Sequence, residues 1–230
     1  MDGDALSMAA GNAAEFWTRV ARARGYETEA ADGWLAVMGD ERYGTRVLTL
    51  RATDLSDRKT RTGELIEDAF GAVDLTAEGA TMRQLPIMIR YPDEPVAEPR
   101  IPVRRVTDAR DLGTAERLVV EDFSLERFQP YEPGVVFPAA LLDTLEFYLA
   151  EIDGEPVGAC VAVPEEHVVG VYWVTTGTAH RSRGVGRSLM YALLRRFDDR
   201  PMTLTASKLG RPLYESLGFA HITQATWWTR

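Results

Sequence analysis

The spacing of hydrophobic and polar positions changes along the chain, and these changes predict its elements. In residues 184–197, large apolar side chains recur every four positions from Val185 to Phe197, which predicts a helix with one apolar face. Residues 168–176 are rich in β-branched and aromatic side chains and predict a strand. The same reasoning predicts helices at residues 13–24, 62–70 and 211–217, and strands at 34–38, 46–51, 85–91, 103–106, 147–152, 156–163, 202–206 and 220–229.

These elements predict a fold class. Asp153 and Gly154 lie between two of the strands and are a strong signal for a tight hairpin. Antiparallel strands followed by alternating strands and helices predict an α/β fold of the α+β type, with a mixed, mostly antiparallel sheet flanked by helices. Asp108 is placed to cap the helix that follows the strand at 103–106. The part before residue 91 predicts the order α-β-β-α-β and contains no chemical motif that we recognise.

A proline-rich segment separates the two halves. Residues 91–102 contain four prolines, and proline disfavours helix in the residue before it and cannot donate a backbone hydrogen bond. We therefore expect an N-terminal α/β domain over residues 1–95, a linker over 96–102 and a second domain over 103–230.

Composition and charge exclude several classes of protein. The chain of 230 residues is 45% hydrophobic, which suits a globular core, and no segment approaches the ~20 apolar residues of a membrane helix. Cys160 is the single cysteine, so we expect neither a disulfide framework nor a metal site. The first eleven residues lack a basic n-region, which favours the cytoplasm. Residues 1–99 carry 18 acidic and 11 basic side chains, net −7 of the total −9, which argues against a nucleic-acid partner.

One stretch carries a chemical signal. Residues 174–188 read VTTGTAHRSRGVGRS, in which a strand runs into a loop and Gly184 and Gly186 open the apolar-faced helix. Such a junction directs unpaired backbone N–H groups and the positive end of the helix dipole at one point, where an anion can bind. Arg181, Arg183 and Arg187 add cationic donors. The stretch lacks the Gly-Lys-Ser/Thr ending of nucleotide triphosphatases and the three-glycine dinucleotide fingerprint.

The motif Arg181-x-x-Gly184-x-Gly186 resembles the Arg/Gln-x-x-Gly-x-Gly/Ala signature of the GNAT N-acetyltransferases. Residues 213–219, LYESLGF, resemble the second signature of that family, and residues 103–112 resemble its opening strand and helix. The resemblance covers about residues 101–230. It implies a GNAT acetyltransferase domain over residues 103–230. Residues 1–95 are then either a degenerate GNAT-like domain or an unrelated lid or interaction domain.

The resemblance implies acetyl-CoA as co-substrate. Its pantetheine arm would pair with the strand backbone at residues 174–176, and its diphosphate would lie on the loop at 181–188. The implied cofactor-binding residues are Val174, Thr175, Thr176, Arg181, Ser182, Arg183, Gly184, Val185, Gly186, Arg187, Ser188 and Ser207. Tyr214 matches the tyrosine that commonly protonates the departing thiolate. A phenol has an ordinary pKa of about 10 and a thiol of about 8.5, so this proton transfer is feasible near neutral pH.

The acceptor is expected to be an amine on a small molecule, and its nitrogen is expected to attack the thioester directly. At pH 7 the solution is about 3.4 pH units below the ordinary pKa of an alkyl amine. Deprotonating the amine therefore costs roughly 4.6 kcal/mol and calls for a base or a water chain. The candidates are Glu151, Glu165, Glu166, His167 and His180, and the sequence favours none of them. Two alternatives stay open: a non-catalytic sensor or scaffold that binds acyl-CoA, and an enzyme that uses a longer acyl donor. The chain could also form a homodimer.

Overall fold

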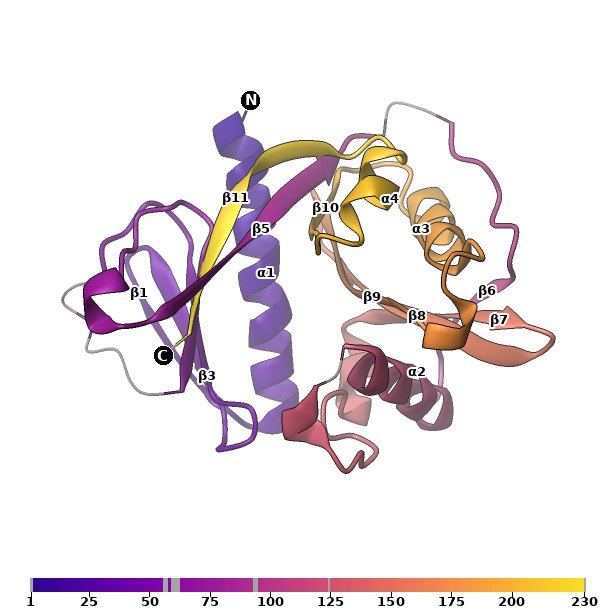
Figure 1. Ribbon diagram of the computed structural model, residues 1–230, viewed down its shortest axis with the longest axis horizontal. Coiled ribbons are helices and arrows are strands. Elements are labelled where there is room, and N and C mark those ends of the chain that lie inside the picture. Colours follow the sequence, from indigo (N-terminus) through magenta and orange to yellow (C-terminus); the bar gives the residue numbers. More distant parts are fainter. Residues whose placement is uncertain (1, 56–57, 59–62, 93–94, 124, 230) are drawn as a thin grey trace. The chain divides into compact units, whose positions relative to one another are not determined.

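The computed structural model describes residues 2–55, 58, 63–92, 95–123 and 125–229 of the chain (Figure 1). The chain divides into two compact units. The first unit comprises Met1–Arg90 together with Thr203–Arg230, and the second comprises Tyr91–Met202. The proline-rich segment therefore begins where the chain passes from the first unit to the second. Residues 203–230 belong to the same unit as the N-terminal part. Whether residues 1–95 and 103–230 act as separate domains stays a prediction.

The first unit opens with helix α1 (Asp2–Arg24), which is longer than the helix predicted at residues 13–24. Small side chains such as Ala5 and Ala9 are buried in its first half, and alanine contributes only a weak hydrophobic signal to the pattern. Gly25, which has φ 71°, directly follows the helix, and the Tyr26 N–H donates to the carbonyl of Ala21. This is the glycine-terminated helix end that satisfies the last carbonyls.

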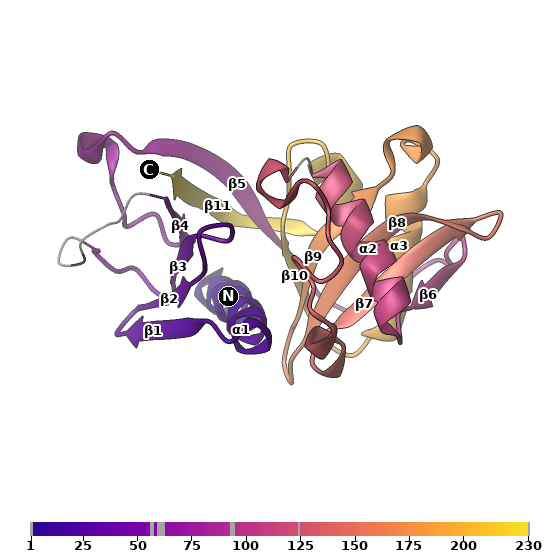
Figure 2. The same ribbon diagram turned by 90° about the horizontal axis from the view of Figure 1, so that it is seen from below.

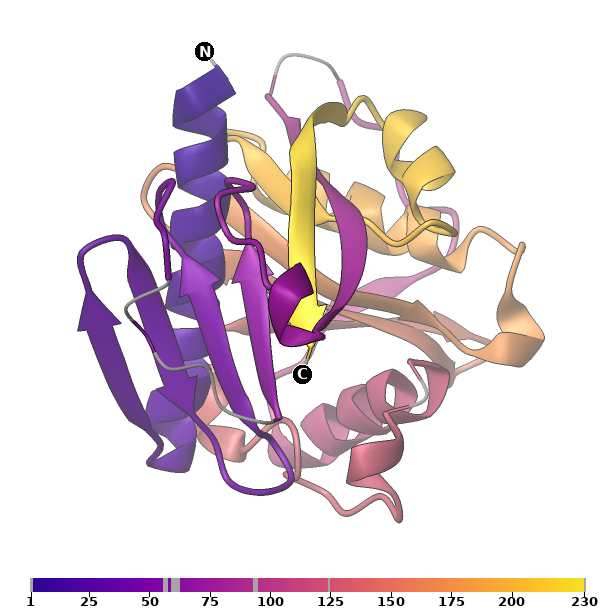
Figure 3. The ribbon, with the colours of Figure 1, turned by 60° about the vertical axis from the view of Figure 1, so that its left-hand side comes forward.

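Helix α1 covers one face of a twisted sheet (Figure 3). In spatial order the strands of this sheet are β1 (Glu27–Ala31), β2 (Trp34–Met38), β3 (Thr45–Thr49), β4 (Glu64–Asp68), β11 (Ala220–Thr229), β5 (Thr81–Arg90) and β10 (Met202–Thr205). Strands β3 and β4 pair in parallel, whereas β1 with β2, β2 with β3, and β11 with both β4 and β5 pair antiparallel. The short elements η1 (Thr76–Glu78) and α4 (Arg211–Glu215) complete this unit. The C-terminal strand β11 thus lies between two strands from the first ninety residues.

The helix predicted over residues 62–70 is wrong, because strand β4 occupies its described part. Its side chains alternate between more and less buried positions, and charged residues, Glu64 and Asp68, take two of the three buried ones. The Glu64 carboxylate receives two hydrogen bonds of 2.8 Å from the guanidinium of Arg58, and the Asp68 carboxylate accepts one of 2.9 Å from the Thr49 hydroxyl. A pattern that assigns charges to the surface cannot detect such a strand. The order in this half is therefore α-β-β-β-β-β.

Strand β1 was not predicted. All five of its residues are exposed, so it has no apolar alternation. It forms because it pairs antiparallel with β2 across a turn at Gly33, which has φ 98°.

The second unit is a four-stranded antiparallel sheet with a helix on each face (Figure 2). Its elements are β6 (Val103–Arg105), α2 (Ala109–Asp122), η2 (Glu126–Phe128), η3 (Ala139–Asp143), β7 (Glu146–Ile152), β8 (Glu155–Pro164), β9 (Val169–Thr176), η4 (Thr178–His180) and α3 (Val185–Arg196). The strand order is β9-β8-β7-β6, with α2 and α3 on opposite faces. The predicted fold class, a mostly antiparallel sheet flanked by helices, is confirmed.

Local sequence signals account for much of this unit. The Asp108 carboxylate accepts a 2.9 Å hydrogen bond from the Asp111 N–H and caps α2, as predicted. Asp153 and Gly154 have φ values of 53° and 80° and form the tight turn between β7 and β8. None of the described helices is long and apolar enough to cross a membrane.

Candidate functional site

The junction between β9 and α3 has the geometry of an anion site. Ser182 and Gly184 both adopt left-handed backbone conformations, with φ of 61° and 87°, and α3 begins at Val185. No side chain in the described part of the chain caps this helix start. Its first N–H groups therefore remain available for a ligand, and the helix dipole adds positive potential there.

A cavity of about 550 Å³ opens at this helix start. Its lining residues are Ala97, Glu98, Arg100, Ser182, Arg183, Gly184, Arg187, Ser188 and Tyr191. Three of the nine are arginines, and the single carboxylate, that of Glu98, forms a 3.1 Å ion pair with Arg195. The cavity therefore combines a helix N-terminus with an excess of positive charge, which suits a phosphate-bearing ligand.

The proline-rich segment forms one wall of this cavity, although the sequence marked it only as a linker. Ala97, Glu98 and Arg100 come from that segment. The Ile101 N–H donates a 3.2 Å hydrogen bond to the Ser188 hydroxyl, which holds the segment against α3. Ser188 is buried, and its hydroxyl binds the backbone of the segment that forms this wall.

The loop is held from α2 as well. The carboxylate of the half-buried Asp122, at the end of α2, accepts a 3.1 Å hydrogen bond from the Thr178 hydroxyl. The same carboxylate lies 3.8 Å from a guanidinium nitrogen of Arg181. Arg183 contacts the His180 ring at 3.2 Å. Arg181 thus contacts Asp122 and is not among the lining residues, whereas Arg183 and Arg187 are.

Strand β9 carries an irregularity where the pantetheine arm is predicted to bind. Tyr172 pairs with Val161 and Thr175 with Ala159, so two residues of β9 oppose the single Cys160 of β8. This is a β-bulge, and its first residue, Trp173, has φ 56°. Val174 and Thr176 are partly exposed and Thr175 is buried.

Tyr214 and Ser207 belong to the other compact unit. Tyr214 lies on α4, is 8% exposed and packs edge-on against Phe219 with ring centroids 5.9 Å apart. The Ser207 hydroxyl accepts a 3.0 Å hydrogen bond from the Gly210 N–H and so stabilises the start of α4. The structure therefore brings five of the predicted loop residues around one cavity, namely Ser182, Arg183, Gly184, Arg187 and Ser188, and describes Tyr214 and Ser207 within a separate unit. Their cofactor roles stay predictions.

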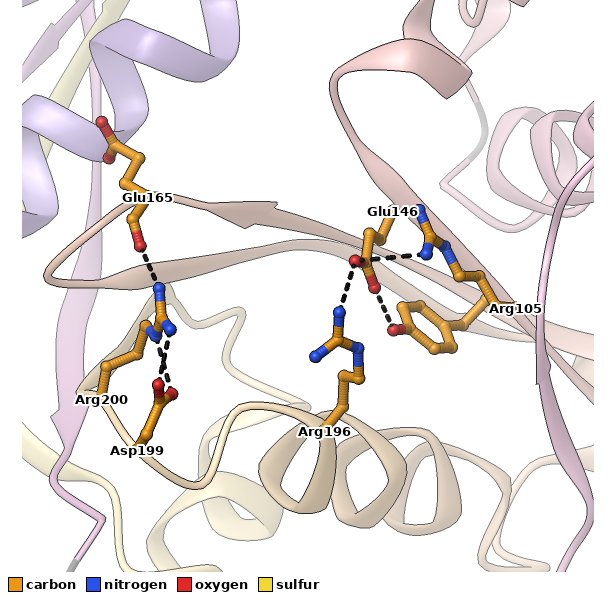
Figure 4. Close-up of polar contacts among 7 residues, drawn as sticks. Arg105, Glu146, Glu165, Arg196, Asp199 and Arg200 are labelled. Carbon is orange, nitrogen blue, oxygen red and sulfur yellow. Dashed lines mark hydrogen bonds and ion pairs between the residues drawn. The ribbon is translucent and has the colours of Figure 1, made fainter.

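The candidate bases differ in their surroundings. Glu151 accepts a 2.7 Å hydrogen bond from Arg104, which also pairs with Asp111. Glu166 and His167 are strongly exposed. Figure 4 shows that Arg200 binds the main-chain oxygen of Glu165, at 2.7 Å, and not its carboxylate.

A second charged cluster lies around Glu146 (Figure 4), and sequence reasoning missed it. The buried Glu146 carboxylate lies 3.2 Å from Arg196 and 3.5 Å from Arg105, and it accepts a hydrogen bond from Tyr148. Burial and this hydrogen bond raise the pKa of the Tyr148 hydroxyl. The cluster ties β6, β7 and the end of α3 together.

Neither a metal site nor a nucleophilic cysteine emerges among the described residues. These residues contain no group of three or more histidine, cysteine, aspartate or glutamate side chains placed to hold a metal ion. Cys160 is 0% exposed in the middle of β8, and burial raises the pKa of its thiol.

We therefore expect Cys160 to be unreactive in the folded protein, since a buried thiol kept protonated is a poor nucleophile. Ellman's reagent should show no fast reaction in buffer and one reactive thiol per chain after denaturation. Fast labelling of the folded protein would contradict the buried position of Cys160.

The comparisons with known proteins identify this part of the chain. The family model of the acetyltransferase (GNAT) family matches residues 113–219, which include the loop, α3 and α4. No curated protein matches the chain at a significant level.

Among solved structures, the chain is similar to a GCN5-related N-acetyltransferase from Kribbella flavida, with TM-score 0.62 and 17% identity over 96% of this chain and 94% of that chain. It is also similar to a GCN5-related N-acetyltransferase-like protein from Streptococcus suis, with TM-score 0.56 and 13% identity over 89% of this chain and 88% of that chain. At these identities the likeness shows a shared fold.

Proposed function

Because the chain belongs to the GNAT superfamily of acetyltransferases, we propose that it transfers an acetyl group from acetyl-CoA to an amine, with a small molecule as the acceptor. The observation that carries the proposal is the arginine-lined cavity at the start of α3. CoA carries a diphosphate and a ribose phosphate, and both need cationic or N–H donors. A cavity of about 550 Å³ also falls within the range of small-molecule sites.

In this proposal, different residues bind different parts of acetyl-CoA. The first N–H groups of α3, with Arg183 and Arg187, would hold the diphosphate. The bulged end of β9, over Val174–Thr176, would orient the pantetheine arm by backbone hydrogen bonds. Arg100 would add a donor from the proline-rich segment.

The chemistry needs two proton movements. Acetyl-CoA, when bound, supplies the acetyl group and a sulfur leaving group. The acceptor nitrogen would replace that sulfur on the carbonyl carbon, giving an amide and the free CoA thiol. Tyr214 would hold the proton that the sulfur takes up, and one of the candidate bases or water would accept the proton that the amine loses.

We expect Tyr214→Phe to lower kcat by ten-fold or more while the Kd for acetyl-CoA changes by less than two-fold. The ring of Tyr214 packs against Phe219, and phenylalanine preserves that packing while it removes the proton donor. General acids contribute roughly 10²–10⁴-fold, and water can replace part of this. Steady-state kinetics and calorimetry measure the two quantities.

Tyr91→Phe is the matched control, since Tyr91 is exposed, and it should leave both quantities unchanged. If Tyr214→Phe instead weakened acetyl-CoA binding and left kcat intact, Tyr214 would be a binding residue and the proposed proton donor would be wrong.

The function itself is tested by the release of CoA thiol from acetyl-CoA in the presence of a panel of amines, with mass spectrometry of the products. The proposal expects thiol release that depends on one class of amine, with one acetyl group added to the nitrogen. Tight binding of acetyl-CoA without thiol release for any amine would indicate an acyl-CoA-binding sensor or scaffold.

A further inference from the structure

Glu116 is a buried carboxylate that holds a loop in place. It lies within α2 and is 0% exposed. One carboxylate oxygen accepts hydrogen bonds from the N–H groups of Val136 and Phe137, the latter at 2.8 Å. The other accepts a 2.6 Å hydrogen bond from the Gly134 N–H and lies 3.0 Å from the Tyr131 hydroxyl. A single side chain therefore satisfies three backbone donors of residues 131–137.

The Glu116 carboxylate provides the hydrogen-bond acceptors that a helix or strand would otherwise provide for these backbone N–H groups. The segment between η2 and η3 forms neither helix nor strand, so its N–H groups need partners from elsewhere. An ionised carboxylate without such bonds would be costly to bury, and donors on both of its oxygens offset that cost. The loop and the carboxylate thus depend on each other, and removal of Glu116 would leave the backbone donors of the loop unpaired inside the protein.

The loop leads to the bulge of β9 through aromatic contacts. The Phe137 ring lies 5.9 Å from the ring of Trp173 and 5.1 Å from that of Phe147. On its other side, Trp173 lies 5.7 Å from Phe123, which follows α2 and is 45% exposed. Trp173 is the left-handed residue of the bulge and directly precedes Val174.

A left-handed backbone at a bulky residue persists only when the surroundings hold it. For Trp173 the surroundings are Phe123 at the end of α2 and Phe137 on the loop that Glu116 fixes. A change at Glu116 that released the loop would remove one of these two aromatic partners. The bulge, and with it the course of β9 at Val174–Thr176, would then lose part of its support.

We propose that Glu116 is a positioning residue for acetyl transfer: by fixing residues 131–137, it holds Phe137 against Trp173 and keeps the bulge of β9 in the conformation in which the thioester is attacked. The inference rests on the proposed function and adds a residue that is not among those lining the cavity. The diphosphate part of the proposed site, at the start of α3, does not include the loop, so loss of Glu116 lowers turnover more than it lowers CoA affinity.

The test compares Glu116→Gln with Glu146→Gln. Both residues are buried carboxylates of the same unit, but Glu146 binds arginines and a tyrosine on the α3 side of the sheet (Figure 4), whereas Glu116 binds backbone on the α2 side. Each variant is labelled with 5-fluorotryptophan and examined by fluorine NMR. Trp173 is the only tryptophan in residues 91–202, and Trp173→Phe assigns its resonance among the five of the chain.

In Glu116→Gln we expect the Trp173 resonance to shift or broaden, kcat for thiol release to fall ten-fold or more, and the Kd for CoA to rise by a clearly smaller factor than kcat falls. In Glu146→Gln the Trp173 resonance should be unchanged. Tyr131→Phe, which removes only one hydroxyl near Glu116, should give a smaller effect of the same kind in a folded protein even if Glu116→Gln folds poorly.

The inference is overturned if Glu116→Gln and Tyr131→Phe leave the Trp173 resonance and kcat unchanged, or if both glutamine variants lower kcat equally, as a general loss of stability would do. A wild-type protein that releases no thiol with any amine overturns the proposed function instead, and the role of Glu116 in transfer falls with it.

Discussion

Replacing Gly184 by aspartate should abolish binding of acetyl-CoA, with a Kd raised at least a hundred-fold. Gly184 directly precedes α3 and has φ 87°, a conformation that other residues adopt at a cost of roughly 1–2 kcal/mol. A carboxylate there would stand at the positive end of the helix, in a cavity whose other charged groups include Arg100, Arg183 and Arg187. It would repel the diphosphate and would also compete for those arginines. Calorimetry should show one site per wild-type chain and no measurable heat for the variant.

Two further variants separate charge from backbone strain. Gly79 has φ 73°, lies in the other unit and, like Gly184, has no atom within 4 Å of an added Cβ. Gly79 is not among the residues that line the cavity, so Gly79→Asp carries the same strain and charge outside it and should bind acetyl-CoA normally. Gly184→Ala carries the strain alone and should weaken binding by less than the aspartate. Unchanged affinity in Gly184→Asp, or two binding sites per wild-type chain, would place the diphosphate elsewhere.

The parts of the site that are local in sequence could be predicted. The strand, loop and helix around residues 168–197 were found because periodicity and two glycines fix them within a few residues. The predicted strand at residues 220–229 coincides with β11 (Ala220–Thr229). Arg183, Gly184, Arg187 and Ser188 were also identified as a group, and they line one cavity.

What could not be predicted depends on burial of polar groups and on contacts between distant segments. Glu116 is a charged residue within α2, and its partners lie about twenty residues away. Arg100 lines the cavity because the Ile101 N–H binds Ser188, a contact across 87 residues. The helix predicted at residues 62–70 failed because Glu64 and Asp68 are buried with specific partners. Sequence patterns treat charge as a mark of the surface, and the buried Glu116, Glu64 and Asp68 break that rule.

The arrangement of β11 leads to the second large effect. This strand pairs antiparallel with β5, from Ala220 opposite Ile89 to Thr229 opposite Thr81. It pairs on its other side with β4. Trp228 packs with Val47 and Ile66 in one apolar core, and Ala225 packs with Ala9 and Ile87 in another. Both neighbours and both cores of β11 therefore come from residues before 91.

A protein that begins at residue 96 is accordingly expected not to fold, although it contains the whole predicted acetyltransferase region. Removing β4 and β5 would leave both edges of β11 unpaired and expose Trp228, which is 5% exposed in the full chain. The 2.9 Å hydrogen bonds from Arg90 to the Leu217 carbonyl and from the Ala206 N–H to the Pro86 carbonyl would also be lost. Circular dichroism should show no cooperative melting of this fragment, and calorimetry should show no binding of acetyl-CoA.

The matched control contains every residue of the chain and lacks only the peptide bond between residues 95 and 96. Residues 1–95 and 96–230, produced together as two polypeptides, should associate through the β5–β11 and β4–β11 pairings and bind acetyl-CoA, because a break between residues 95 and 96 removes no strand. The comparison separates a need for the first 95 residues from a need for an unbroken chain. If residues 96–230 alone were soluble, melted cooperatively and bound acetyl-CoA as the full chain does, the second half would be an autonomous domain. The pairing of β11 with β4 and β5 would then contribute little to its stability.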